Sequence, residues 1–236
     1  MALSELAFDA GLAVFCEKPL TVDFDAARRC IERIESEGHR AAVNFALAST
    51  QGLSLLQKTF GSGSTSPLGA LTGIELDIAF AAWPRPWQAA AGAWLGERIE
   101  GGFTREVLSH FVFVLQRVLG PLTVQSSVVD YPAGGSEAET ALRAELVEAG
   151  VPIRIEAQVA GEIADQNRMV WRAAEGEISL SGWFSQITQQ TADAALPAPI
   201  DQLDQWAALI EGRAHSLPGY AESLAVQQTI EALLKQ

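Results

Sequence analysis

The sequence predicts an α/β segment followed by an α+β segment. In residues 1–48 a helix, a short apolar strand, a helix and a second strand alternate, as they do in a doubly wound parallel sheet. Beyond them, stretches of alternating apolar and polar residues recur between turn residues, as in an antiparallel sheet with one solvated face. We therefore expect a remnant of a parallel sheet, then a mostly antiparallel open-faced sheet with flanking helices.

The first part contains two predicted helices and two predicted strands. Apolar residues at helical spacing before Gly11 predict a short amphipathic helix, and they are Leu3, Leu6, Ala7 and Ala10. The apolar run 13–16 is typical of a strand buried on both faces of a parallel sheet, and Pro19 ends it. Residues 23–37 predict a helix that ends before Gly38, and residues 41–47 predict a second strand.

The second part is predicted to be an antiparallel meander with one interposed helix at 106–119. The alternating stretches are 71–82, 123–129, 139–147, 153–159, 167–173 and 178–184. Turn signals separate them at Gly134-Gly135, Gly150, Gly161 and Glu175-Gly176. Two helices, 201–213 and 220–234, close the chain. The pattern changes near Ser49, so we expect one domain over 1–48 and another over 49–236.

Composition excludes several classes of protein. A formal charge of -13 with dispersed basic residues argues against a nucleic-acid partner, because such binding depends on Lys and Arg that neutralise phosphates. Two cysteines are too few for a disulfide framework, and no apolar run is long enough for a membrane span. The N-terminus lacks a basic leader, so a cytoplasmic location is expected.

Two short motifs could carry chemistry. Glu17, Lys18 and Pro19 follow the first predicted strand, at the sheet edge where ligands of α/β proteins bind. Lys18 is either part of a solvated strand end or a donor that stabilises negative charge on a substrate oxygen. Glu106 and His110 are four residues apart on a predicted helix, so they project from one face, and His110 suits proton transfer near neutral pH. Such pairs are more often structural, and two ligands alone do not make a metal site.

An aromatic stretch offers a candidate pocket. Arg85, Trp87 and Trp94 could line a site for a sugar or a carboxylate, although packing against the sheet is an alternative role for some of these tryptophans. His39 and His215 lie next to a helix end and in a terminal loop, respectively, and are expected at the surface.

The ordered motifs resemble the Gfo/Idh/MocA oxidoreductases, the family of glucose-fructose oxidoreductase and inositol dehydrogenase. Val14-Phe15-Cys16-Glu17-Lys18-Pro19-Leu20 resembles the Glu-Lys-Pro strand of that family. Gly101-Gly102 followed by Glu106 and His110 is similar to its Gly-Gly, acid, three residues, His helix, and residues 217–234 resemble its closing helix.

The resemblance implies an NAD or NADP cofactor contacted by Glu17, Lys18 and Pro19, and a sugar, cyclitol or related polyol as substrate. It implies that Lys18 contacts the substrate hydroxyl, that His110 removes the hydroxyl proton, and that Glu106 replaces the usual Asp. The Arg often found after the sixth strand is replaced here by residues 45–49, Phe-Ala-Leu-Ala-Ser. The resemblance also implies a homo-oligomer, a dimer or tetramer formed through the open sheet.

The phosphate-binding part of such a cofactor domain is missing from the sequence. Dinucleotide binding in this fold uses a glycine-rich turn between a strand and a helix, and no such turn precedes Glu17. We therefore expect a chain that lacks the N-terminal half of its cofactor domain and binds the nicotinamide cofactor poorly. The alternative is a non-catalytic assembly or ligand-binding module derived from the same family.

Overall fold

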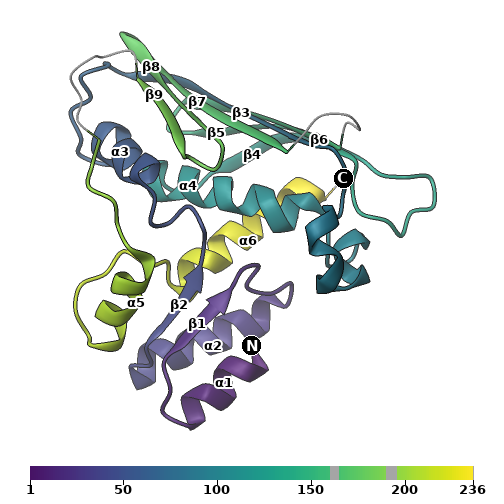
Figure 1. Cartoon of the computed structure of the whole chain (residues 1–236), viewed down its shortest axis with the longest axis vertical. Coiled ribbons are helices and arrows are strands. Elements are labelled where there is room, and N and C mark those ends of the chain that lie inside the picture. The colour runs from purple at the N-terminus through teal and green to yellow at the C-terminus, as the bar shows by residue number, and fades with distance from the viewer. Residues whose placement is uncertain (160–164, 190–195, 236) are drawn as a thin grey trace.

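The computed structural model describes residues 1–159, 165–189 and 196–235. Figure 1 shows three layers: a seven-stranded sheet, helices beneath it, and a two-stranded parallel sheet with helices of its own. The turn predicted at Gly161 lies outside the described residues. No helix in the described part of the chain is both long and apolar enough to cross a membrane.

The small sheet has the predicted helix and strand order. α1 (Ala2–Asp9) precedes β1 (Val14–Glu17), and α2 (Phe24–Glu37) connects it to β2 (Ala41–Asn44), which is parallel to β1. α2 ends at Gly38, whose φ of 71° is the left-handed conformation that favours glycine at this position.

Three expectations about burial in this unit differ from the structure. β1 is only half-buried, because within the described residues β2 is its single partner strand and its other edge is open. In α1, Leu3 and Leu6 are 83% and 64% exposed, while Phe8 is buried and stacks on His39 with ring centroids 4.4 Å apart. The helix therefore packs through Phe8, not through the leucines. His39, expected at the surface, has only a partly exposed side chain.

The C-terminal segment packs against the small sheet. α5 (Gln202–Ile210) covers one face, where Trp206 stacks on Phe15 with ring centroids 5.2 Å apart. The N–H of Val43 donates to the carbonyl of Pro218 at 2.8 Å, and the hydroxyls of Ser4 and Tyr220 are 2.9 Å apart. Residues from both ends of the chain thus build this unit, and the division into 1–48 and 49–236 stays a prediction.

The large sheet has the strand order β4-β5-β6-β3-β7-β8-β9. Its strands are β3 (Leu71–Phe80), β4 (Thr123–Asp130), β5 (Ala141–Glu148), β6 (Val151–Val159), β7 (Gln166–Ala173), β8 (Gly176–Ser181) and β9 (Gln186–Gln189). The predicted fold class is confirmed: the sheet is mostly antiparallel and follows a parallel unit.

Three details differ from a simple meander. β3 lies between β6 and β7 and is parallel to β6, with Ile74 opposite Ile153, because the earliest strand inserts into the centre of the sheet. β8 ends at Ser181, short of the predicted residue 184, and a tight turn leads into β9, which the sequence did not indicate. β5 begins at Ala141, so Glu139 lies before the strand.

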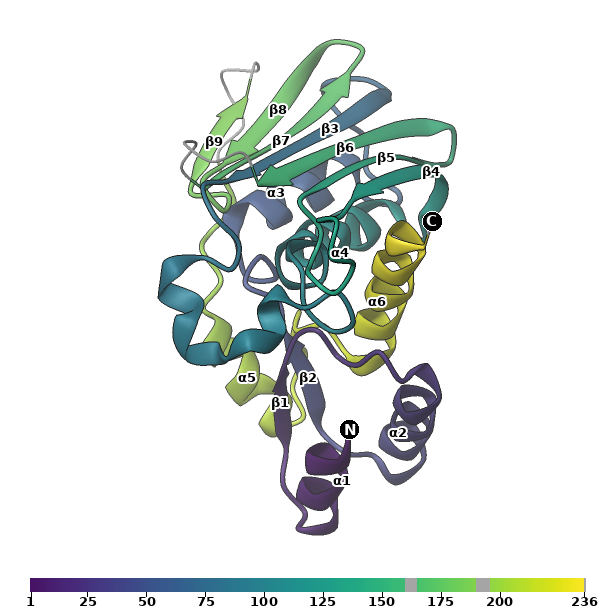
Figure 2. The same cartoon turned by 90° about the vertical axis from the view of Figure 1, so that its right-hand side faces the viewer.

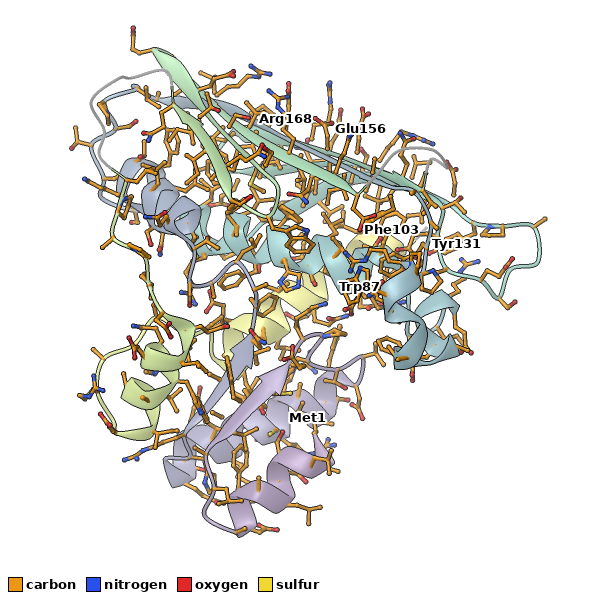
Figure 3. All side chains as sticks on the ribbon, viewed as in Figure 1. Met1, Trp87, Phe103, Tyr131, Glu156 and Arg168 are labelled. Carbon is orange, nitrogen blue, oxygen red and sulfur yellow. The ribbon has the colours of Figure 1, made fainter. Side chains whose placement is uncertain are left out.

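The helices cover one face of the large sheet, and charged side chains occupy the other. α3 (Gln51–Phe60), α4 (Ser109–Leu119) and α6 (Tyr220–Leu234) lie beneath the sheet, and α6 runs beside α4 (Figure 2). α4 is the central helix, and its side chains at 111–115 are fully buried, which is the property of a helix apolar on all sides. Glu156 and Arg168 are on the opposite, open face (Figure 3).

Candidate active site

The three residues predicted to contact a cofactor lie at the carboxyl end of β1. Glu17 is exposed, and its Oε1 accepts a hydrogen bond of 2.8 Å from Nδ2 of Asn44 at the end of β2. Lys18 instead extends toward the helices under the large sheet. Pro19 is half-buried beside it. The end of β1 thus places the Glu17 carboxylate beside β2 and the Lys18 ammonium beside Glu106, at the start of the helix layer.

Lys18 forms a buried ion pair with Glu106. Its Nζ is 2.9 Å from Oε1 of Glu106, and the Lys18 side chain is 7% exposed. The same Nζ also donates to the backbone carbonyl of Glu106. Burial lowers the pKa of Lys18 from its ordinary value, and the negative charge of Glu106 opposes this shift without cancelling it. Two of the three ammonium protons are therefore engaged by one residue.

Glu106 lies in a π-helical turn, not in the α-helix that the sequence predicts. This turn, η3 (Thr104–Leu108), runs directly into α4, so the helix begins earlier than residue 106 and is wound more loosely at its start. Within the described residues the ion-pair partner of Glu106 is Lys18, and the hydrogen-bond partner of His110 is Ala46. The acid therefore orients the lysine, although Glu106 and His110 are four residues apart in sequence.

The turn is held in place by a buried carboxylate that the sequence did not single out. Oε1 of Glu139 accepts a hydrogen bond of 2.6 Å from the N–H of Thr104, and Glu139 is 2% exposed. The φ of Gly102 is 97°, and a Cβ at that position would lie 2.1 Å from Oε2 of Glu139. Glycine at position 102 is therefore required for two reasons, the left-handed backbone and the close approach of Glu139.

His110 is held by a backbone hydrogen bond and by aromatic rings. Its Nδ1 accepts from the N–H of Ala46 at 3.2 Å, and the residue is 6% exposed. The rings of Phe45 and Trp183 meet the imidazole edge-on, with centroids 5.7 and 5.4 Å away. Ala46 belongs to the segment that replaces the arginine expected from the family resemblance.

The surroundings of His110 keep its imidazole neutral. Burial lowers the pKa of His110 well below its ordinary value, and the positive charges of Lys18 and Arg85 lower it further. Because a backbone N–H can only donate, Nδ1 is the acceptor nitrogen and the ring hydrogen is on Nε2. The site therefore presents a neutral imidazole whose Nε2–H is the group available to a substrate oxygen.

Arg85 joins the same cluster. It is 7% exposed, its Nε donates to Oε1 of Gln88 at 3.0 Å, and its guanidinium lies 4.6 Å from the ring centroid of Trp87. Burial lowers the pKa of Arg85, while Asp165, 3.6 Å away, and Glu106 oppose the shift. We define the Lys18 cluster as Lys18, Arg85, Glu106 and His110, whose charges act on one another.

The two tryptophans predicted with Arg85 do not share its position. Trp87 is 70% exposed and touches the cluster through the guanidinium of Arg85. Trp94 donates a local hydrogen bond of 2.8 Å from Nε1 to the carbonyl oxygen of Ala91. Both lie on short 3₁₀ segments, η1 (Pro86–Ala91) and η2 (Ala93–Gly96), and their role in binding stays a prediction.

Sequence reasoning missed four contributors to the site: Ala46, Glu139, Asp165 and Trp183. A backbone N–H has no sequence signal, and the acids looked like ordinary members of strands or loops. Gly182 could have marked the turn that carries Trp183. No group of three or more His, Cys, Asp or Glu that could hold a metal ion occurs within the part of the chain that the structure describes.

Comparisons with known proteins show the fold. No family model matches the sequence, and no curated protein matches it. Among solved structures, an oxidoreductase from Thermotoga maritima has a TM-score of 0.79 at 15% identity and covers 99% of this chain and 72% of its own.

Two further structures carry bound cofactors. A dehydrogenase, WlbA, from Bordetella pertussis in complex with NADH and UDP-GlcNAcA has a TM-score of 0.78 at 19% identity, over 98% of this chain and 72% of its own. A 3-ketoreductase from Actinomadura kijaniata in complex with NADP has a TM-score of 0.73 at 18% identity, over 98% of this chain and 73% of its own. The likeness to oxidoreductase structures that the motifs predicted is confirmed at the level of the fold.

The close approach at Gly102 predicts a large effect of a single methyl group. We expect Gly102→Ala to lower the free energy of unfolding by about 3 kcal/mol or more, because it combines a left-handed backbone with a clash against a buried carboxylate. Gly135→Ala is the matched control: its φ is 75°, and an added Cβ meets nothing within 4 Å. We expect it to cost about 1 kcal/mol. Urea denaturation measures both, and equal losses would contradict the role given to Glu139.

Proposed function

We propose that this chain is an NAD- or NADP-dependent oxidoreductase acting on a secondary alcohol of a sugar, cyclitol or related polyol. The observation that carries the proposal is the Lys18 cluster, in which a buried lysine lies close enough to a neutral histidine to lower the pKa of that histidine, although the two are far apart in sequence. The bound NADH, NADP and sugar nucleotide named for the similar structures support the cofactor and substrate classes. We assign the cofactor unit to residues 1–48 and the substrate unit to 49–236.

Lys18 is proposed as the residue that exchanges the proton with the substrate oxygen. Two of its ammonium protons go to Glu106, which leaves one donor for a ligand. A group transfers protons best when its pKa lies near the working pH, and burial moves the pKa of Lys18 in that direction. Glu106 fixes the ammonium in position and keeps it from losing its proton too easily.

His110 is proposed to hold the same oxygen through Nε2–H. In the tautomer set by Ala46, this nitrogen donates a hydrogen bond and stabilises negative charge on the oxygen. To remove the hydroxyl proton itself, as the family resemblance implies, the ring would have to give up the Ala46 hydrogen bond and carry its hydrogen on Nδ1. The geometry therefore favours Lys18 over His110 as the group that gives its free ammonium proton to the substrate oxygen in the reducing direction and, as the neutral amine, takes that proton back in the oxidising direction.

The residues present fit only the reactive end of a nicotinamide cofactor. When bound, the nicotinamide ring supplies or accepts the hydride. Glu17, Lys18 and Pro19 stand at the carboxyl edge of a parallel sheet, where ligands of this fold class bind. The sequence has no glycine-rich turn for the pyrophosphate ahead of Glu17.

The second candidate function is a non-catalytic assembly or ligand-binding module, which the open charged face of the large sheet would serve. The two candidates differ in what precedes Met1 in the gene. An in-frame upstream extension that encodes a strand, a glycine-rich turn and a helix would favour the enzyme, and a nearby stop codon would favour the module.

Substitutions in the cluster test the catalytic roles in a preparation that turns over substrate. We expect Lys18→Ala and His110→Ala each to lower kcat by about 10²- to 10⁴-fold with an unchanged fold, as measured by the absorbance of the reduced nicotinamide and by circular dichroism. His110→Gln keeps a side-chain donor, so we expect it to retain more activity than His110→Ala. Near-normal turnover in Lys18→Ala would refute the role of the lysine, and equal losses in both His110 variants would favour a base role for His110.

The 236-residue polypeptide itself is predicted to bind the cofactor weakly. Without backbone N–H groups around the pyrophosphate, we expect titration calorimetry with NAD(H) or NADP(H) to give a Kd no tighter than about 1 mM, or about -4 kcal/mol. Micromolar binding of either nucleotide would overturn this prediction and would require a phosphate site elsewhere in the chain.

We also propose that copies of the chain pair through the open face of the large sheet. Its charges alternate across strands, with Arg143 opposite Glu156 and Asp77 opposite Arg168, so a two-fold copy can present complementary charges. We expect sedimentation to show a dimer or tetramer, and Glu156→Arg to shift it toward monomer. Glu35→Arg, at an exposed position of α2, is the control that should leave the mass unchanged. A monomeric wild-type chain would contradict the proposal.

A further inference from the structure

The turn between β8 and β9 has an unusual backbone. Gly182, Trp183 and Phe184 are consecutive residues with φ of 56°, 58° and 66°. Glycine adopts this left-handed conformation freely, but each bulky residue there costs about 1–3 kcal/mol. Strain of this kind persists only where surrounding contacts enforce it, and it is common where a side chain must be presented to a ligand.

Several contacts enforce the turn. Oδ1 of Asn167 accepts from the N–H of Trp183 at 2.7 Å, and Asn167 is itself 8% exposed. The hydroxyl of Ser185 donates to the carbonyl of Gly182 at 2.6 Å. Phe184 is buried against Gly52 of α3, where an added Cβ would lie 2.9 Å from the Phe184 ring. These contacts therefore hold the turn against α3 in a single position.

As a result, the Trp183 ring is held beside the imidazole of His110. The indole meets the imidazole edge-on at 5.4 Å and lies against Phe111 at 5.6 Å. Trp183 is half-buried, so part of the indole is reachable from solvent. The same turn borders a hollow of about 550 Å³ whose other side is formed by Thr50 and Gln51.

Packing alone does not account for this tryptophan. Phe184, one residue later, already fills the buried position against Gly52, and a strained half-exposed ring recovers less free energy from burial than a buried ring would. A ring held rigidly next to a candidate catalytic histidine, with one part open, has instead the properties of a binding surface.

We propose that Trp183 is a substrate-binding residue, on which the apolar C–H side of a polyhydroxylated ring rests while one hydroxyl reaches Nε2 of His110. The negative face of an indole attracts the polarised C–H groups of a sugar or cyclitol, and its area excludes water from them. This inference rests on the proposed function, because it assigns a subsite to that reaction. Asn167 is then a positioning residue, which acts by holding the turn.

The test compares ring and backbone effects at the same position. Trp183→Asn removes the ring but tolerates a left-handed backbone, Trp183→Phe keeps an aromatic face, and Ser179→Ala changes β8 outside the turn. Binding of myo-inositol and of D-glucose is measured by saturation-transfer NMR, with and without NAD(H). We expect the apparent Kd to rise about tenfold or more in Trp183→Asn, and to stay within about threefold in the other two variants.

A second measurement observes ligand binding in the wild-type chain. The indole N–H resonance of Trp183 in the wild-type chain, assigned by its absence from Trp183→Phe, should shift when either probe binds. Equal affinity of wild type and Trp183→Asn, or an unshifted resonance while a probe is bound, would overturn the role of Trp183 and leave the proposed function intact. Binding of neither probe to the wild-type chain, with or without NAD(H), would count against the proposed function and against this inference together.

Discussion

The candidate site depends on the buried ion pair between Lys18 and Glu106. Removing two charges from water costs several kcal/mol for each ion, and a close pair with good hydrogen bonds does little more than recover that cost. Two well-packed apolar side chains in place of Lys18 and Glu106 would stabilise the fold equally well. The importance of the contact is therefore geometric: it ties the end of β1 to the start of the helix layer at one point and, among the residues that the structure describes, leaves one ammonium proton without a partner.

The position of Glu106 rests in turn on contacts that have no chemical role of their own. Glu139 holds the first N–H of the π-helical turn, and Gly102 permits its approach. Next to Glu106 in sequence, Arg105 forms a two-point contact with Glu231 of α6, with N–O distances of 2.6 and 2.9 Å. These fully buried or nearly buried polar contacts can be satisfied in only one arrangement, so they specify the path of the turn more than they stabilise it.

Charge and strain are both concentrated around His110. Two cations and the loss of solvent keep its imidazole neutral, and a backbone N–H selects its tautomer. Trp183, whose ring contacts His110, lies in a turn of three consecutive residues with left-handed backbone conformation. Such departures from relaxed backbone and ordinary pKa values occur together at functional sites, because a reactive arrangement has to be held against the local preferences of the chain.

The sequence by itself determined the fold class, the order of most of its elements and the two motifs at Lys18 and His110. Those depend on local periodicity, on glycine and proline positions, and on short spacings, all of which can be read along one segment. It did not reveal that β3 inserts next to β6, that Leu3 and Leu6 are exposed, or that β8 stops before Trp183. Only the tertiary structure decided that Glu106 serves Lys18 and that Ala46 and Trp183 flank His110, because these contacts join residues far apart in the chain, where no local pattern records which partner burial will select.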